Sequence, residues 1–241
     1  MVSQPSMTIS KRHHYIPRYY LDWFENQDGA LWRLDKESGL ITRGNKAHFG
    51  YKKHWNRLRN PPLGYQPDWA EKRLAEVDGI ASVTLRRILS GDFPAKITAL
   101  ACAISFMQNN QPRVQQELKS TNPDKVAHWT DDFWLIVRVN TALDSVGLYD
   151  PIHYWVQVID ESDARSSFLT SSNPLIEFTN KPMKLFPISN RHCLVLSYDA
   201  GFEGAKPNFT RCNAARVAEI NRLTIKNSWQ YVYSSTPDFK E

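Results

Sequence analysis

Two adjacent histidines, His13 and His14, stand just before Ile16-Pro17 and Arg18 near the start of the chain. A neutral imidazole can take a proton from water, and an arginine beside it can hold a phosphate or a carboxylate. Pro17 suits the first position of a helix, because its missing backbone N–H costs nothing there. The free N–H groups of such a helix start favour an anion. The stretch HHYIPR therefore predicts chemistry on a phosphate group, with His14 as general base and His13 beside it.

One enzymatic hypothesis treats the first 60 residues as a diverged HNH-type nuclease module. Such modules use one histidine as general base, an asparagine that holds it, and a later histidine as metal ligand. His14 would be the base, and Asn45 and His54 show the nine-residue offset common in that motif. Lys53 or Arg57 would contact phosphate. On this hypothesis the cofactor is a divalent metal ion, and His54 is one of its ligands.

A second enzymatic hypothesis needs no metal. His14 acts as general acid or base, and Arg18 and Arg113 clamp a phosphate or carboxylate in bidentate fashion. The amides of Gln108 and Asn173 orient the substrate. The alternative for Gln108 and Arg113 is that they hydrogen-bond the helical middle of the chain to the N-terminal motif. Both enzymatic hypotheses predict a phosphodiester- or phosphate-directed hydrolase, in the first place a nuclease, which loses turnover in His14→Ala.

Cations alternate with aromatic residues between Asn45 and Arg59, in the order NKAHFGYKKHWNRLR. Such interleaving is typical of a groove that holds a nucleic-acid backbone and its bases. The expected contact residues are Lys46, Lys52, Lys53, Trp55, Arg57 and Arg59. A non-catalytic nucleic-acid or protein interaction module that uses residues 46–59 is therefore the alternative to an enzyme. It predicts salt-dependent binding that survives His14→Ala.

The positive charge of the chain is concentrated in its first quarter. The formal net charge is +5, yet residues 1–60 hold eleven Lys and Arg against five Asp and Glu, and the remainder holds nineteen against twenty. The whole basic surplus thus accompanies HHYIPR and the basic segment 46–59. We expect a polyanionic partner, above all a nucleic acid. A solvated basic face without a partner is the alternative.

The composition predicts a globular protein with a sizeable core. The chain has 241 residues, 41% of them hydrophobic, and eight tryptophans. It has no run of eighteen apolar residues, and residues 1–12 lack the apolar region of a signal peptide, so we expect a cytoplasmic protein without membrane contact. Cys102, Cys193 and Cys212 are odd in number and widely spaced, which favours reduced thiols over a disulfide framework.

The elements that must position these residues follow from hydrophobic periodicity and turn residues. Asp68 and Glu71 resemble a capping box at the start of a helix that ends at Gly91. Further helices are expected over 17–24, from about 94 to Pro112, from 122 to 143, and over 213–226. A hairpin over 30–34 and 40–43 and strands over 154–159, 193–198 and 231–233 complete the expected elements.

These elements predict one α+β domain over residues 1–241. It has an N-terminal motif helix and β-hairpin, a central bundle of three or four helices, and a C-terminal antiparallel β-rich part that returns to the N-terminal motif. A loop at 60–67, rich in proline, is a soft internal boundary. The helical middle is expected at about 68–146 and the β-rich part at about 153–235.

Five segments resemble the domain-of-unknown-function family 4238: HHYIPRYYLDWF near the N-terminus, QNNQPR at 108–113, TSSNP at 170–174, LFPIS at 185–189, and the closing INRLTIKNSWQYVYS. The resemblance covers nearly the whole chain, and the opening motif is its most specific part. The family has no settled activity, so the resemblance implies positions rather than a mechanism. Those positions are His13, His14, Pro17, Arg18, Gln108, Arg113, Ser171, Asn173, Pro174 and Asn221.

The TSSNP turn departs from the pattern of this family at one residue. Family members often carry an aspartate before the Asn-Pro pair, and this chain has Ser172 there. The turn therefore offers no carboxylate. For Ser171 and Asn173 the alternative to a role at the site is a polar turn, in which small side chains bond to nearby backbone.

Overall fold

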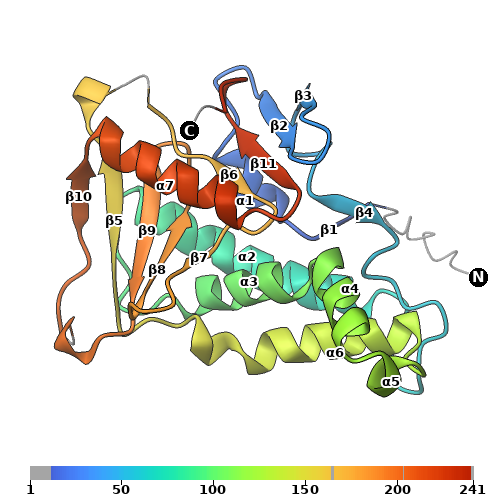
Figure 1. Ribbon diagram of the computed structural model, residues 1–241. Coiled ribbons are helices and arrows are strands. Elements are labelled where there is room, and N and C mark those ends of the chain that lie inside the picture. Colours follow the sequence, from blue (N-terminus) through green and yellow to red (C-terminus); the bar gives the residue numbers. More distant parts are fainter. Residues whose placement is uncertain (1–11, 164–165, 203, 240–241) are drawn as a thin grey trace, which may run out of the picture.

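The computed structural model describes residues 12–163, 166–202 and 204–239 (Figure 1). This part of the chain forms seven α-helices and eleven strands, which confirms the predicted α+β class. The helices are α1 (Arg18–Asp22), α2 (Trp69–Leu89), α3 (Thr98–Asn109), α4 (Pro112–Thr121), α5 (Pro123–Val126), α6 (Asp131–Asp144) and α7 (Ala214–Asn227). None of the described helices is long and apolar enough to cross a membrane. Residues 1–11, on which the expectation of no signal peptide rests, lie outside the described residues.

The strands form three sheets. Two strands, β1 (Arg12–His14) and β4 (Tyr51–Lys53), pair antiparallel near the N-terminus. A four-stranded antiparallel sheet has the order β3 (Ile41–Gly44), β2 (Leu31–Asp35), β11 (Tyr231–Ser234) and β6 (Thr170–Ser171). A five-stranded sheet has the order β10 (Phe209–Cys212), β5 (His153–Ile159), β9 (His192–Ser197), β8 (Met183–Pro187) and β7 (Ile176–Glu177). The pair β10 and β5 is parallel, so this sheet is mixed and not wholly antiparallel as expected.

The five-stranded sheet is covered on both faces, as Figure 1 shows. Along β9, Leu194 and Leu196 face the largest hydrophobic cluster, which includes core residues of α2 and α3. Cys193 and Val195, the alternate residues, face a second cluster with α7. This alternation is the period of two that places successive side chains on opposite faces of a strand. It explains why the strand is apolar throughout.

The helical middle has five helices, α2 to α6, where three were expected along the chain and a bundle of three or four was predicted. Pro112 does not end a helix followed by a loop; it occupies the first position of α4, after Gln111 in the extended conformation. The single helix expected from 122 to 143 is divided into α5 and α6. The break is at Thr130, whose side chain accepts a hydrogen bond from the N–H of Phe133 at 3.2 Å and caps α6.

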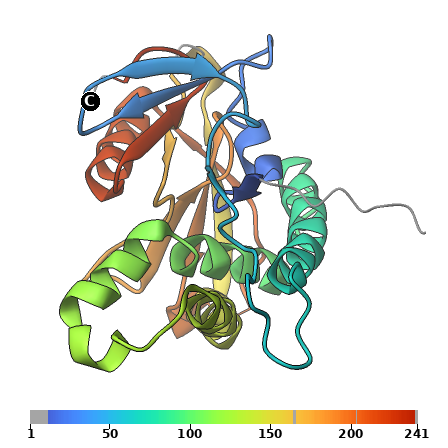
Figure 2. The same ribbon diagram turned by 90° about the vertical axis from the view of Figure 1, so that its right-hand side faces the viewer.

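The C-terminal part returns to the N-terminal motif, as expected. Strand β11 pairs with β2, and the Tyr20 hydroxyl donates to the Pro187 carbonyl at 2.6 Å. Figure 2 shows the segment after β3 descending from the four-stranded sheet to the helical layer. Gly50 lies on this path with φ +65°, and its carbonyl accepts the N–H groups of Tyr15 and Ile16. The path therefore brings β4 and the loop after it against both HHYIPR and the helices.

The expected capping box at the start of α2 is wrong. Asp68 stands at the N-cap position, but its side chain caps no backbone N–H of the helix and forms an ion pair with Lys72 at 3.2 Å instead. The Glu71 carboxylate turns instead to Asn56, whose amide donates to it at 2.7 Å. The Glu71 carboxylate thus makes a tertiary contact with the loop after β4 in place of the capping-box hydrogen bond that the Asp68–Glu71 spacing predicted. The helix start that was expected to favour an anion belongs to α1, which has only five residues, so the dipole of this helix contributes little there.

Candidate functional site

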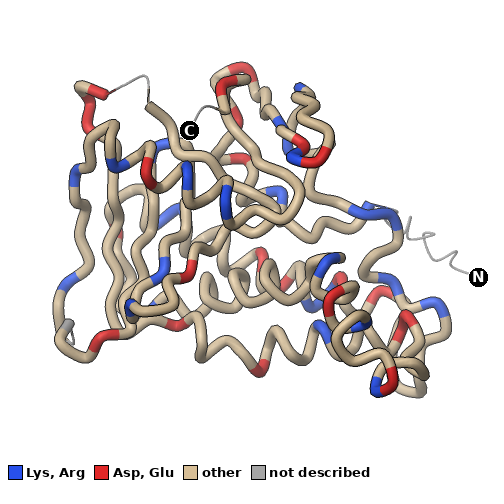
Figure 3. The backbone as a smooth tube through the Cα atoms, in the orientation of Figure 1, with Lys and Arg blue, Asp and Glu red and all other residues tan. Residues whose placement is uncertain are grey.

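A cavity of about 290 Å³ lies between the loop after β4, helix α4 and helix α6. We call it the cation pocket. Six cationic side chains line it: Lys52, Lys53, Arg57, Arg59, Lys119 and Arg138. Asp131 is the only acid among its described lining residues. Figure 3 shows several Lys and Arg positions at the right-hand end of the molecule, where β4, the following loop and α4 meet, with Asp and Glu positions among them.

Arg138 is the buried centre of the cation pocket, with 5% of its surface exposed. Its guanidinium carbon lies 3.7 Å from the centroid of the Trp55 ring, and Nη2 donates to the Trp55 carbonyl at 3.2 Å. Nε and Nη1 have no hydrogen-bond partner within the part of the chain that the structure describes. Burial lowers the pKa of Arg138 to about 9, against a smaller opposing effect of Asp131. The side chain therefore stays charged at neutral pH, with two buried donors open to an anion.

Lys52 is the second cation against Trp55, with its Nζ 4.4 Å from the ring centroid. Desolvation and then the nearby charge of Arg138 lower the pKa of Lys52. An added anion would relieve this repulsion. Trp55 was predicted to contact bases, but the structure uses its ring to hold cations. A base that stacked on it would have to displace one of them.

The loop that carries Trp55 is fixed from several sides. His54 bends the chain with φ +56°, and the indole N–H of Trp55 donates to the Asn110 carbonyl at 2.8 Å. The carboxylate of Asp132, at the start of α6, accepts the N–H groups of Arg59 and Asn60 at 2.7 and 2.5 Å. These bonds arrange the wall of the cation pocket before any ligand arrives, so little ordering entropy is lost on binding.

His13 helps to hold this loop in place. It is 1% exposed, and its Nδ1 accepts the N–H of Asn56 at 2.7 Å. The Glu71 carboxylate lies 3.6 Å from the same nitrogen and also accepts from the Asn56 amide. Since β1 pairs with β4 through His13 and Lys52, the N-terminal motif fixes one wall of the cation pocket.

His14 points to a different cavity, of about 190 Å³, which we call the histidine cavity. Arg18 and Asp78 line it with His14, and Glu71 forms part of its wall. Burial, and then the charge of Arg18, lowers the pKa of His14 to about 4. Burial, and then the charge of Glu71, raises the pKa of Asp78 to about 7. Two groups with oppositely displaced pKa values in one cavity are the usual arrangement of an acid and a base.

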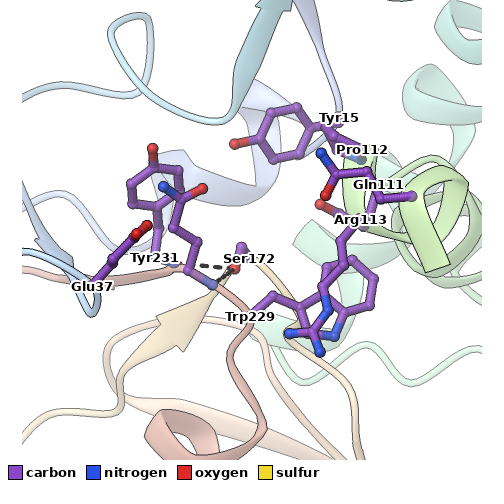
Figure 4. Close-up of a pocket in the computed structure, with 10 residues that line it drawn as sticks. Tyr15, Glu37, Gln111, Pro112, Arg113, Ser172, Trp229 and Tyr231 are labelled. Carbon is purple, nitrogen blue, oxygen red and sulfur yellow. Dashed lines mark hydrogen bonds between the residues drawn. The ribbon is translucent and has the colours of Figure 1, made fainter. Parts of the chain in front are cut away.

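Arg113 is separated from His14 and Arg18. It lines a third cavity, of about 310 Å³, which we call the aromatic pocket, and it forms an ion pair with Glu117 at 2.7 Å. Figure 4 shows the Tyr15 and Tyr231 side chains on two sides of this pocket and Arg113 against Trp229. Arg113 thus reaches the HHYIPR motif at Tyr15 and not at the histidines. The bidentate clamp expected from Arg18 and Arg113 together is not assembled at one cavity.

The remaining expected site residues lie in several places. Asn173 and Asn227 exchange hydrogen bonds, amide nitrogen to carbonyl, at 3.2 and 3.0 Å, which joins the TSSNP turn to the end of α7. Ser171 bonds locally to Asn173, as in the polar-turn alternative. The Nε2 of Gln108, on α3, is buried without a partner among the described residues. Lys46 pairs with Asp22 and Glu25 and does not line the cation pocket.

His54 was expected to bind a divalent metal. Its ring lies 6.3 Å from that of His13, centroid to centroid. Within residues 12–163, 166–202 and 204–239 there is no group of three or more His, Cys, Asp or Glu side chains that could hold a metal ion. His54 therefore has no set of co-ligands in this part of the chain.

Sequence reasoning missed Arg138, Lys119 and Asp78. For Arg138 an indication was available, because it lies on the buried stripe of α6 between Leu135 and Val139. A cation on an apolar stripe must find an aromatic or anionic partner. Lys119 and Asp78 carry no such indication, since each lies on a partly polar helix face.

Comparison with known protein families shows which of these cavities lie in residues that a family model matches. The family described as "Protein of unknown function (DUF4238)" matches residues 12–113 and 151–238. The chain belongs to the DUF4238 family. No curated protein and no solved structure matches it. In this DUF4238 protein the histidine cavity lies within the matched residues, whereas Lys119, Asp131 and Arg138 lie in the unmatched stretch 114–150.

Proposed function

We propose that this DUF4238 protein binds the phosphate groups of a nucleic acid in the cation pocket. The observation that carries the proposal is Arg138, a buried guanidinium with two nitrogens that no described group satisfies. A buried charge without an anion is costly, and its persistence is explained if an anionic ligand completes the site. A guanidinium presents parallel donors that match two phosphate oxygens.

The surrounding charge favours a ligand with several phosphates over a single carboxylate. Five further cations line the same cavity against Asp131 alone among the described lining residues. Lys119, from α4, and Lys53, from β4, line the same cavity as Arg138 from two further elements. A polyanion can engage them together and release its counterions. This supports the predicted nucleic-acid partner and shifts the contact residues from Lys46 to Lys119 and Arg138.

The test is the binding of a fluorescein-labelled oligonucleotide, followed by anisotropy over a series of salt concentrations. We expect the logarithm of the affinity to fall linearly with the logarithm of the salt concentration, with a slope of about −2 for three contacted phosphates. Lys119→Ala should weaken binding about tenfold at low salt and reduce the slope, because an exposed lysine of the pocket is lost. Lys125→Ala is the matched control, since this exposed lysine of α5 does not line the pocket.

Equal losses in the Lys119 and Lys125 variants would mean that binding follows net charge and not the pocket. No binding by the unaltered protein at low salt would contradict the proposal outright.

A second candidate function is hydrolysis of a phosphodiester at the histidine cavity, with His14 as general base. The specific observation in its favour is that His14, Asp78 and Arg18 line one cavity. His14, neutral above pH 4, would take a proton from water; Asp78, protonated below about pH 7, would give one to the leaving oxygen. Arg18 would hold the phosphoryl oxygens.

The two cavities adjoin the same short sheet. His13 and Lys52 form one register pair of β1 and β4, and His14 and Tyr51 form the next. Hydrogen bonds also link the two cavities. Asn56, between two lining residues of the cation pocket, bonds to His13 and to Glu71, and Glu71 lines the histidine cavity. Because adjacent strand residues point to opposite sides, binding in the cation pocket and cleavage at His14 are separate functions that need separate tests. Screening of His14→Gln for nuclease activity alongside oligonucleotide binding separates the two functions: loss of cleavage with intact binding supports the hydrolase, and cleavage equal to that of the unaltered protein contradicts it.

A further inference from the structure

The aromatic pocket and the cation pocket share a wall. Pro112 and Gln116, from the first turn and a half of α4, line both cavities. Arg113 faces the aromatic pocket only, and Gln115 faces the cation pocket only. Helix α4 thus stands between two cavities that open on its two sides. A ligand longer than one cavity can occupy both by passing over this helix start, whose dipole also favours negative charge.

The two cavities differ sharply in chemistry. The aromatic pocket contains one cation, Arg113, and one acid, Glu37, so its lining is nearly neutral. Tyr15 and Tyr231 stand on two sides, and Trp229 lies with its ring centroid 5.9 Å from the Arg113 guanidinium carbon (Figure 4). Burial raises the pKa of Tyr15 to about 12, so its hydroxyl stays neutral. Such a lining takes a flat, uncharged, weakly polar group.

Amide groups complete the aromatic pocket. Gln111 is 1% exposed, and its Nε2 donates to the Met107 carbonyl at 2.7 Å, which fixes the orientation of the side chain at the pocket wall. Gln116 and Gln230 also line the cavity and are exposed at its rim. Side-chain amides offer a donor and an acceptor together, the pattern that the edge of a nucleobase requires.

We infer that the two pockets form one site for a nucleotide unit, with its phosphate in the cation pocket and its unpaired base in the aromatic pocket. This inference rests on the proposed function, since it assumes that the cation pocket binds phosphate. The substrate class is then single-stranded nucleic acid, because a base that enters a cavity of about 310 Å³ cannot remain paired. Trp229 supplies the stacking surface, because a single cation lies 5.9 Å from its ring centroid, whereas two cations lie 3.7 and 4.4 Å from that of Trp55.

The experiment compares three probes with the full chain: a thymidine pentanucleotide, the same backbone with abasic sites throughout, and a duplex that contains the pentanucleotide sequence. Affinities are measured by competition against a labelled oligonucleotide. We expect the pentanucleotide to bind about tenfold more tightly than the abasic backbone, because a stacked base contributes that much or more. The duplex should bind no better than the abasic backbone.

The variant Trp229→Leu tests whether the tighter binding of the base-bearing probe depends on the Trp229 ring. This variant keeps an apolar side chain at the partly buried position but removes the ring, so it should bring the pentanucleotide to the affinity of the abasic backbone and leave the latter unchanged. Trp32→Leu is the matched control, since Trp32 is also partly buried and lines neither pocket. Thermal melting shows whether either variant is folded, and Gln111→Ala provides a second variant of the pocket if Trp229→Leu is not.

The outcomes distinguish the inference from the proposed function. If the pentanucleotide and the abasic backbone bind equally well and the Trp229 and Gln111 variants change neither, the base site is refuted while phosphate binding stands. If neither single-stranded probe binds, both the base site and the proposed function are refuted. A tenfold preference for the base-bearing probe that disappears in the variants supports the inference.

Discussion

The guanidinium carbon of Arg138 lies 3.7 Å from the centroid of the Trp55 ring, and both residues line a cavity that six cations border. The ring stabilises the cation, and the carbonyl of the same tryptophan accepts one of its N–H groups. These contacts hold the side chain in place without neutralising it. The pair therefore resembles a prepared anion site more than a packing contact.

Arg138→Met should separate stability from binding. The variant removes a desolvated charge and keeps much of the side-chain volume, so in phosphate-free buffer it should be as stable as the unaltered protein or more stable by about 1 kcal/mol. It should also lose oligonucleotide binding. Urea unfolding and anisotropy measure the two effects. A loss of stability of several kcal/mol would instead assign Arg138 a structural role.

Hydrolysis at the histidine cavity should follow a bell-shaped pH profile. His14 acts as a base only when deprotonated, so the rate should rise through about pH 4. Asp78 acts as an acid only when protonated, so the rate should fall through about pH 7. Asp78→Asn should lower the rate and remove the dependence on the upper pKa. A profile that still falls near pH 7 in this variant would exclude Asp78 as the acid.

Asp78 should also make stability depend on pH. Its folded-state pKa of about 7 lies above the ordinary 3.8, so the folded state binds the proton more tightly than the unfolded state. This stabilisation is full below pH 3.8 and is lost as pH rises to about 7. Asp78→Asn should therefore gain stability relative to the unaltered protein, by about 4 kcal/mol at pH 8 compared with pH 4. Urea unfolding at the two pH values measures this gain, and an unchanged difference would contradict it.

Gly50→Ala should destabilise the protein through two separable effects. Gly50 has φ +65°, and a Cβ there would lie 3.0 Å from Cβ of Ile16. We expect a loss of about 2 to 3 kcal/mol, from backbone strain and from crowding. Gly29→Ala is the matched control, because Gly29 has φ +68° with nothing within 4 Å of the added Cβ. Its loss, about 1 kcal/mol, reports the strain alone. Equal losses in thermal melts would show that the contact with Ile16 relaxes freely.

Regular patterns in the amino-acid sequence were sufficient to predict several local elements. The spacing of Leu74, Ala81, Leu85 and Ile88 specified α2, the Gly-containing turn before Leu40 specified the β2 and β3 hairpin, and the apolar run at 193–196 specified β9. Membership of the DUF4238 family was likewise readable from HHYIPR and the later segments. These features are local, because they depend on side-chain period and turn chemistry within a few residues.

Which charged and aromatic groups come into contact depends on the three-dimensional fold. Lys52 and Arg138 are 86 positions apart, yet both lie against Trp55. Lys46, only six positions from Lys52, forms ion pairs with Asp22 and Glu25 instead. The two neighbouring histidines also have different surroundings. His13 is buried and accepts a hydrogen bond from the Asn56 N–H, whereas His14 lines a cavity with Asp78. The physical reason is that adjacent strand residues point to opposite sides, and that charge compensation depends on distances in space, which sequence spacing does not contain.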